Sequence, residues 1–506
     1  MPAAALTAPR AAPLRADASE HRPLERSARP VRGRASVRAG RGRAVQPRRA
    51  AQHVAAPSGA RGRGSRSACA AQAARGAARA ARDAGRDGVQ ASRVLLVGGT
   101  GKIGVAAAAH LLRTDPAICV TLAGRSAEGR KGAAAAYEAA MAAGGPADSC
   151  RVGTLRLELA CSDELEAAVR GYDAVLHTAG PFGEDDTSLL EACIAAGVPC
   201  YCDVADPISY LKKARSEAMN AKAAKSGTMA LCAAGAFPGL SNLLAAKMAR
   251  GGGMPSAVQD VDFSYFTAGL GGSGAVNLLI TNLGFGALLP RFRSGAYAPE
   301  RKAGVGGGQV DFFLTEDDAS FRRVGTRDVW PWPFPEAATV AEHLHIRGNS
   351  NASMGTAPDI WNGVMRVMCE VLPRDWWADE RFSGALADFS RPLVALTDAF
   401  VGETHCMRVD VTFEDGARAS AVQGHESFRS CVGQSLAEFA LELLARRGTP
   451  LFAPGVRCPE EVFAADEAVD GGQAADALLE RLCSTPGTFT YSTRVVGAAH
   501  PAEVKA

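Results

Sequence analysis

The sequence lacks the cysteine pairs that a redox or zinc site would need. Its 13 cysteines are scattered from Cys69 to Cys483, and none forms a C-x-x-C pair. An odd number of unclustered cysteines does not indicate a disulfide framework. Cys200 and Cys202 fall in an apolar run, where cysteine acts as a small hydrophobic residue. We therefore expect no metal site and a reducing compartment.

Acidic residues are scarce, and lysine is absent, at the start of the chain. Of the chain's 56 basic and 53 acidic residues, residues 1–90 hold 19 Arg, no Lys and 5 acidic residues, so the remainder is net acidic. An Arg-rich, acid-poor leader whose apolar residues are nearly all Ala is typical of an organellar transit peptide and cannot bury a core. A basic arm for nucleic acid is the alternative, but the acidic remainder carries no nucleic-acid-binding motif.

We therefore predict a disordered transit peptide over residues 1–90 and no nucleic-acid partner. The expected destination is the chloroplast, with the mitochondrion as the alternative.

No long apolar run is free of glycine. Residues 268–290 contain no charged residue and are long enough to span a bilayer. Glycines and asparagines interrupt this stretch, so residues 275–289 are better interpreted as a buried helix behind a Gly-rich loop. The sequence predicts no transmembrane span and leaves peripheral lipid contact open.

Strand and helix patterns alternate after the leader. Expected strands lie at residues 94–97, 118–123, 155–159, 174–178, 198–204 and 228–233, and expected helices at 102–113, 128–143, 162–170, 187–196 and 209–225. This alternation predicts a doubly wound parallel α/β (Rossmann) sheet over residues 91–240.

A different pattern follows this segment. Longer alternating strands are expected at residues 258–267, 310–314, 405–413 and 417–427, the last two joined by the hairpin signal Glu414-Asp415-Gly416. They predict a second, largely antiparallel α+β domain over residues 241–430 for substrate binding or oligomerisation, and a homodimer is left open. Trp330 to Pro335 is expected to form a rigid, amphipathic loop that packs on the surface rather than serving as a proline-rich ligand. Residues 431–506, with a helix at 430–447, are expected to pack back on the first domain.

The sharpest motif is Gly98-Gly99-Thr100-Gly101-Lys102-Ile103-Gly104, directly after the first expected strand and opening a helix. It contains G-x-G-x-x-G. We expect Gly99 to permit the tight turn, Gly101 to let backbone N–H groups approach a pyrophosphate, and Gly104 to let the helix pack on the strand. The helix N-terminus would then hold the anion.

The end of the second expected strand selects the cofactor. An acidic residue there would bind the ribose hydroxyls of NAD. This position holds Gly124, followed by Arg125 and Ser126, and Glu128 falls on the next helix. An arginine in this place can make charge-assisted hydrogen bonds to a 2′-phosphate. We therefore predict NADP(H), bound in part by Arg125 and Ser126.

The later strand ends supply the other candidate residues. Ala179-Gly180-Pro181 is a small corner that can pass close to the nicotinamide ribose, whereas His177 is expected inside the strand core. Asp203, which ends the fifth strand, is predicted to orient a ligand or to cap the following helix.

The candidate substrate pocket lies between the two expected domains, because its residues occupy strand ends or connecting loops. It comprises Asp203, Phe237, Pro238 and Tyr265. Asp203 and Tyr265 are the catalytic candidates.

The sequence resembles the saccharopine dehydrogenase-like family of NADP-binding oxidoreductases, in particular its plant and algal members. The resemblance runs from about residue 93 to at least residue 463. It implies a Rossmann domain, an inserted domain for substrate and a C-terminal return to the Rossmann side. It also implies hydride transfer to or from a small carbonyl or imine compound that is amino acid-like. The resemblance rests on Val97 to Gly101, Ala123 to Arg125, Ala179 to Phe182, Ala234 to Ser241, Tyr265 to Gly269 and Pro459 to Glu461.

Two other functions remain open. Short-chain reductases share the G-G-T-G-x-x-G pattern but use a Tyr with a Lys four residues later, and no Tyr here has that neighbour; Tyr210 is followed by Ala214. An atypical short-chain reductase is one alternative. A non-catalytic NADPH-binding protein, associated with lipid surfaces, is the other.

Overall fold

The computed structural model describes residues 91–142, 151–160, 162–183, 186–250, 256–269, 275–465 and 467–497. The predicted transit peptide at residues 1–90 lies outside the described residues, as does most of the Gly-rich loop before residue 275.

The first sheet has seven parallel strands in the order β15-β6-β5-β4-β1-β2-β3. The first six strands along the chain confirm the predicted doubly wound sheet, because β1 pairs with both β2 and β4 and the strand order reverses there. The strands are β1 Ser92–Val97, β2 Ile118–Gly124, β3 Val152–Arg156, β4 Ala174–His177, β5 Cys200–Asp203, β6 Met229–Leu231 and β15 Gly455–Arg457.

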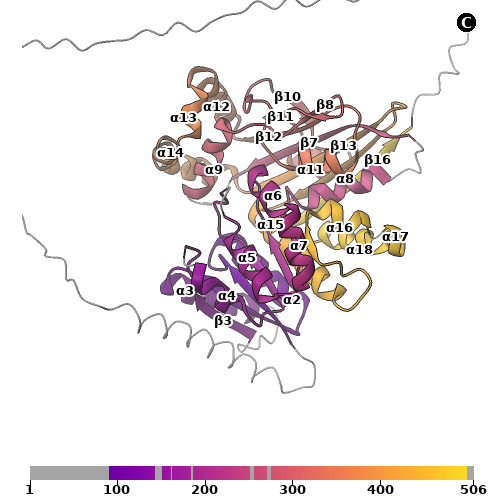
Figure 1. Ribbon diagram of the computed structural model, residues 1–506. Coiled ribbons are helices and arrows are strands. Elements are labelled where there is room, and N and C mark those ends of the chain that lie inside the picture. Colours follow the sequence, from indigo (N-terminus) through magenta and orange to yellow (C-terminus); the bar gives the residue numbers. More distant parts are fainter. Residues whose placement is uncertain are drawn as a thin grey trace, which may run out of the picture. The chain divides into compact units, whose positions relative to one another are not determined.

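Helices cover both faces of this sheet (Figure 1). The alternate residues of β1 contact two separate cores, with Val94 and Leu96 on one face and Leu95 and Val97 on the other. This is why the strand is an unbroken apolar run. The helices are α2 Lys102–Thr114, α3 Ala127–Ala142, α4 Ser162–Val169, α5 Ser188–Ala196, α6 Ile208–Ala214 and α7 Glu217–Ser226. The next helix, α8 Leu240–Arg250, packs instead against the second sheet.

Two predicted elements in this part were wrong in detail. The third strand was expected at residues 155–159, but β3 is Val152–Arg156 because its pairing with β2 sets Gly124 opposite Arg156. The single helix expected at residues 209–225 is broken into α6 and α7. Ser216 causes the break, since its hydroxyl accepts the Met219 N–H at 3.4 Å and caps α7.

The second sheet has the order β10-β11-β12-β7-β13-β14-β16, and β8 also pairs with β12 while β9 pairs with β8. Only the β7–β12 pair on this path is parallel, and β13–β14 forms the predicted hairpin. The strand expected at residues 310–314 is instead β10, at residues 308–311. The strands are β7 Val258–Ala268, β8 Phe292–Arg293, β9 Ala296–Tyr297, β10 Gly308–Asp311, β11 Thr326–Pro331, β12 Ser350–Ala357, β13 Thr404–Phe413, β14 Arg418–His425 and β16 Thr488–Val496.

A group of helices packs beside this sheet, and α9 lies against α13 and α14 (Figure 1). The first two residues of the segment from Trp330 to Pro335 end β11 instead of belonging to the expected loop, and Phe334, at 6% exposed, is packed inward. The helices are α9 Ala275–Gly286, α10 Ala319–Arg323, α11 Glu336–His343, α12 Asp359–Val371, α13 Arg374–Ala378 and α14 Glu380–Val401.

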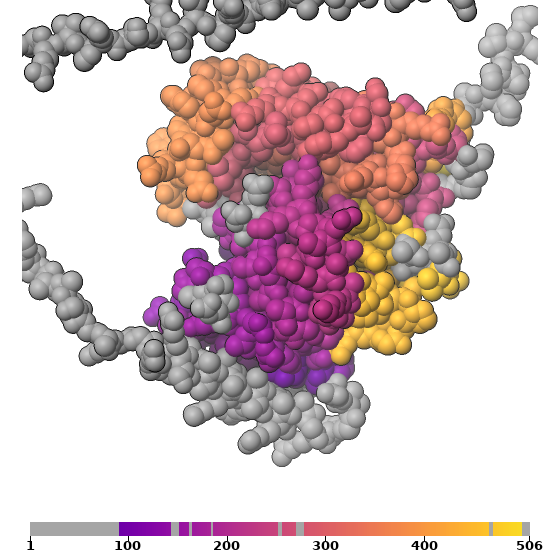
Figure 2. Space-filling model, viewed as in Figure 1, coloured from indigo at the N-terminus to yellow at the C-terminus, as the bar shows by residue number. Residues whose placement is uncertain are grey.

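The C-terminal residues return to the first sheet, as predicted. Helix α15 (Phe428–Arg446) packs on α2, where His110 Nε2 lies 2.6 Å from Glu438 Oε1 and both side chains are buried. Strand β15 joins β6, and yellow C-terminal residues lie against the magenta ones in Figure 2. Strand β16, in contrast, pairs with β14 in the second sheet. The remaining helices are α16 Pro459–Ala465, α17 Glu467–Asp470 and α18 Gln473–Leu482. The exact domain boundaries stay predictions.

Candidate functional site

The predicted phosphate loop connects β1 to α2. Gly98, rather than Gly99, takes the left-handed conformation that the turn needs, with φ of +82°. A Cβ at Gly98 would lie 2.6 Å from the backbone N of Ala179, so the loop after β4 is packed directly against it. A Cβ at Gly104 would lie 2.5 Å from the Gly98 carbonyl oxygen. The close approach of helix to strand that we predicted at Gly104 is therefore observed.

The N-terminus of α2 is suited to an anion. Gly101 caps the helix without a side-chain hydrogen bond, and the first turn contains no acidic residue. Burial, and then Arg429, lower the pKa of Lys102, although Glu403 opposes them. The backbone N–H groups of a helix's first turn point out of its N-terminus, so they and the helix dipole favour a phosphate bound there.

The end of β2 has the character predicted for a 2′-phosphate site. Arg125 and Ser126 are exposed, and Gly124 carries no carboxylate to repel the phosphate. The Thr100 side chain fills the space beside Gly124, since a Cβ there would lie 2.8 Å from Thr100 Oγ1. Ser126 Oγ also accepts the Gly129 N–H at 3.2 Å.

Two further arginines, which sequence reasoning missed, lie at the same strand ends. Arg156 stands opposite Gly124 in the sheet register, and Arg130 donates to the Gly124 carbonyl at 2.8 Å. Burial, and then the charge of Arg156, lower the pKa of Arg130. The positive charges gathered here would attract a dianionic phosphate. The corrected position of β3 was the missing signal, because it moves Arg156 to a carboxyl end.

The corner Ala179-Gly180-Pro181 is brought beside the phosphate loop. The Thr178 N–H donates to the Val97 carbonyl at 2.8 Å, which ties the residues after β4 to the end of β1. His177, which precedes them, is fully buried, with Nδ1 3.2 Å from the Tyr201 hydroxyl. It occupies the core position that we expected.

Asp203 is buried and accepts hydrogen bonds from the protein's own backbone and side chains. Its side chain is 0% exposed. Its carboxylate accepts the Ala233 N–H at 2.8 Å, the Ala205 N–H at 3.1 Å and the Tyr210 hydroxyl at 2.7 Å. Burial raises the pKa of Asp203, opposed by these hydrogen bonds. Because its acceptor sites hold the turns after β5 and β6, the structure gives Asp203 no open face toward a substrate, in contrast to its prediction as a pocket residue.

Phe237 and Tyr265 meet between the two sheets. Their rings stack at 4.1 Å with an interplanar angle of 16°, and Pro238 is buried next to them. Tyr265 is 0% exposed and donates a short hydrogen bond to Glu336 Oε1. Phe237 lines the cavity described below and Tyr265, stacked behind it, does not, so the catalytic role of Tyr265 stays a prediction.

Glu336, a residue that the sequence did not single out, is the unusual group of this region. It is fully buried at the start of α11, and burial raises its pKa to about 8 despite the Tyr265 hydrogen bond. Asp206, just after β5, has a pKa raised to about 6, again by burial. No local pattern around Glu336 distinguishes it from a helix N-terminal carboxylate on the surface.

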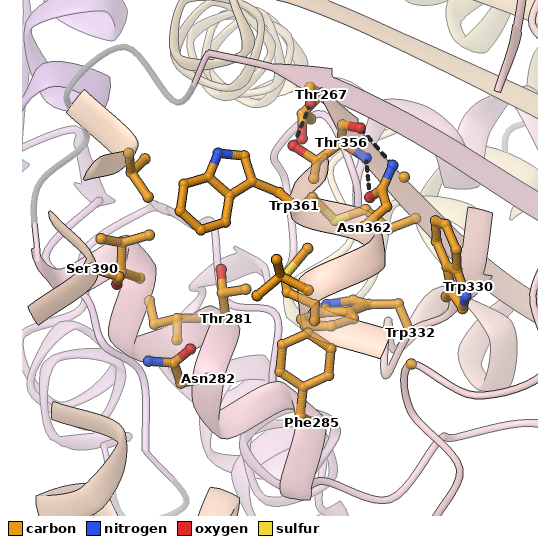
Figure 3. Close-up of a pocket in the computed structure, with 18 of the residues that line it drawn as sticks. Thr267, Thr281, Asn282, Phe285, Trp330, Trp332, Thr356, Trp361, Asn362 and Ser390 are labelled. Carbon is orange, nitrogen blue, oxygen red and sulfur yellow. Dashed lines mark hydrogen bonds between the residues drawn. The ribbon is translucent and has the colours of Figure 1, made fainter. Parts of the chain in front are cut away.

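A cavity of about 220 Å³ opens beside Phe237 and Asp206. Most of its wall comes from β7, β11, β12 and the helices α9, α12 and α14, and Figure 3 shows their side chains pointing into one space. Since Asp206 and Phe237 follow β5 and β6, the cavity reaches the carboxyl ends of the first sheet. Ligands bind at those ends in open α/β sheets. Of the four predicted pocket residues, only Phe237 lines it.

The described residues contain no group of three or more His, Cys, Asp or Glu side chains placed to hold a metal ion. None of their helices combines the length and the apolar character that crossing a membrane requires.

Comparison with known proteins agrees with this geometry. Residues 94–231 match the family model described as the saccharopine dehydrogenase NADP binding domain. No curated protein matches the sequence.

Solved structures resemble the fold. Apo saccharopine dehydrogenase (L-Glu forming) from Saccharomyces cerevisiae has a TM-score of 0.52 and 11% identity, covering 80% of this chain and 100% of that chain. A meso-dapdh mutant with DAP from Clostridium tetani has a TM-score of 0.35 and 13% identity over 73% and 94% of the two chains. A myo-inositol dehydrogenase from Corynebacterium glutamicum has a TM-score of 0.30 and 12% identity over 81% and 100%.

The family match and the phosphate loop together establish the cofactor and, at the coarse level, the reaction class. The protein binds NADP and has the architecture of an NAD(P)-dependent oxidoreductase. Residues 94–231 form a saccharopine dehydrogenase-like NADP-binding domain.

Proposed function

We propose that the protein transfers a hydride between NADP(H) and a small carbonyl or imine compound; the family resemblance suggests an amino acid-like one. The observation that carries this proposal is the cavity at the carboxyl ends of the cofactor-binding sheet. It is lined by Phe237 and Asp206 from the first sheet and by side chains of the second. A site between a nucleotide fold and a second domain is the common arrangement for bound substrate.

The residues present suit the cofactor. The N–H groups at the start of α2 would hold the pyrophosphate, and Arg125, with Arg130 and Arg156 nearby, would hold the 2′-phosphate. Bound NADPH supplies a hydride, and hence two electrons, to the carbon of the C=O or C=N group, whose oxygen or nitrogen then takes up one proton. Asp206 is the titratable residue of the cavity wall at this end, and its raised pKa lets it hold a proton near pH 6. We assign it the delivery of that proton.

Oxidation of NADPH by the full chain tests the reaction. Absorbance at the NADPH band is followed with a panel of aldehydes, ketones and keto acids, the latter with and without an amine. Asp206→Asn should lower kcat about 10²-fold or more on any active compound, with NADPH affinity unchanged, because Asp206 follows β5 and belongs neither to the phosphate loop nor to the arginines at the end of β2. Tight NADPH binding without turnover across the panel would instead favour the non-catalytic NADPH-binding protein.

We also propose that residues 1–90 direct the protein to the chloroplast, on the Arg-rich, acid-poor composition alone. A fluorescent protein fused after residue 90 should accumulate in chloroplasts of leaf protoplasts, and the same reporter fused to residues 92–506 should stay outside them. A mitochondrial signal would select the alternative destination, and a cytosolic one would contradict the proposal.

A further inference from the structure

Aromatic side chains form a large part of the cavity wall. The chain has five tryptophans, and four of them line this one space together with Phe237, Phe285, Phe334 and Phe428. Phe285 packs edge-on against Trp332, with ring centroids 4.8 Å apart, and lies 5.0 Å from Trp377. Rings held in this way form a rigid apolar wall that offers stacking and edge contacts. The four tryptophans are Trp330, Trp332, Trp361 and Trp377.

Charge is nearly absent from the same wall. Asp206, Arg366 and Asp398 are its only charged residues among those that the structure describes, so acidic groups outnumber the one cation. An amino acid-like substrate carries one or more carboxylates. A carboxylate buried without a paired cation is strongly disfavoured. Arg366, the one cation of the described wall, is itself exposed to solvent, so this wall offers no buried cation to pair with such a carboxylate.

Neutral hydrogen-bonding groups gather on one side of the cavity. Figure 3 shows Thr281, Asn282 and Ser390 together, across the space from Trp332. Asn282 Nδ2 donates to the Ser383 carbonyl at 2.9 Å, which fixes the amide and leaves its oxygen as an acceptor position for a ligand hydroxyl. These side chains would accommodate an uncharged polar group rather than an ionised one.

We propose that this cavity binds an uncharged, mostly apolar ligand, a ring or short chain of about ten non-hydrogen atoms, whose carbonyl faces Phe237 and Asp206. The size follows from its volume, because a cavity of roughly 150 Å³ lined by aliphatic and aromatic side chains accommodates benzene. The position of the carbonyl rests on the proposed hydride transfer, whereas the apolar binding does not. The substrate class therefore differs from the amino acid-like one that the family resemblance implies.

Binding of 4-phenyl-2-butanone to the full chain tests this inference without turnover. Its apolar ring and single carbonyl match the cavity, and 2-oxoglutarate is a comparison compound of similar size with two carboxylates. Isothermal titration in the absence of NADPH should show saturable binding of the ketone and at least tenfold weaker binding of 2-oxoglutarate. The reverse order of affinity would overturn the inference.

Substitutions in α12 and α14 test whether the ketone binds in this cavity. Trp361 is half-buried, and its Nε1–H donates to Thr397 Oγ1 at 3.1 Å, which holds the ring beside the cavity. Trp361→Ala should weaken ketone binding about tenfold, because it removes one aromatic wall. The neighbouring Ile360 is 68% exposed and outside the cavity wall, so Ile360→Ala is the matched control and should change nothing. If Trp361→Ala proves unstable, Ser390→Leu is the second variant: the larger side chain fills part of the cavity and should also weaken binding.

The outcomes separate this inference from the proposed reaction. Ketone binding that is lost in Trp361→Ala and Ser390→Leu, without NADPH oxidation by any carbonyl compound, would support the cavity ligand and refute the hydride transfer. If keto acids cause NADPH oxidation and the ketone does not bind, the proposed reaction is supported and the proposal of an apolar ligand is overturned. Ketone binding unaffected by both variants would place the ligand elsewhere and also overturn it.

Discussion

Arg125→Ala is expected to weaken NADPH binding about 10- to 150-fold and to leave NADH binding nearly unchanged. Removing one charge-assisted hydrogen bond to the 2′-phosphate costs roughly 1.5–3 kcal/mol. Arg125 is exposed at the end of β2, where a phosphate can reach it, and Gly124 beside it has no side chain. Fluorescence titration of both nucleotides against both proteins measures the effect.

Three further variants define the role of Arg125. Ser126→Ala should have a smaller effect in the same direction, because a neutral hydroxyl bonds the phosphate less strongly. Arg130→Ala should weaken both nucleotides, since Arg130 is buried and holds the Gly124 carbonyl. Arg113→Ala, at the opposite end of α2, is the surface control and should change neither. Equal losses of NADH and NADPH in Arg125→Ala would mean that Arg125 holds the loop and does not bind the phosphate.

Glu336→Gln is expected to remove a strong pH dependence of stability. Burial raises the pKa of Glu336 from the usual 4.5 to about 8, so between these pH values the folded state binds a proton that the unfolded state has lost. Stability from this group is therefore complete below about pH 4.5 and falls as the pH rises through 8. The loss is on the order of 5 kcal/mol, because the pKa differs by about 3.5 between the two states and each pKa unit corresponds to about 1.4 kcal/mol.

Denaturant unfolding at pH 5 and pH 9 measures this dependence. The glutamine cannot ionise and its carbonyl can still accept the Tyr265 hydroxyl, so Glu336→Gln should exceed the parent protein in stability at pH 9 and lose little at pH 5. Glu342→Gln, on the exposed side of the same helix, is the matched control and should retain the parent's pH slope. An unchanged slope in Glu336→Gln would show that Glu336 ionises normally.

Local patterns predicted the cofactor half of the site, because strand, turn and helix are adjacent in the sequence there. The run before Gly98, the glycines and Arg125 lie within about thirty residues, as nucleotide-binding units do. The error in β3 had a physical cause. Leu155, Leu157 and Leu159 alternate as a strand would, but pairing with β2 starts the strand at Val152 and ends it at Arg156. The hydrogen-bond register with β2 therefore sets the boundaries of β3, whereas the alternation of apolar side chains does not.

The substrate half could not be predicted, because it is assembled from distant segments. Asn282, Trp332, Trp361 and Ser390 come from four elements, and each fits the ordinary composition of its own helix or loop. Asp203 and Tyr265 were chosen because they end or follow strands, yet they are bonded inside the core. Such a cavity is a property of tertiary packing, which no single stretch of sequence carries.

The seventh strand of the first sheet has a consequence for how the protein is made. Strand β6 ends at Leu231, but the strand that completes its edge, Gly455–Arg457, leaves the ribosome only after the whole second sheet except β16. The face of α2 that α15 covers is also open until then. A growing chain thus presents an unpaired strand edge and an apolar helix face, both of which favour aggregation. The nucleotide-binding half is therefore finished late in translation, although its first residues are made early.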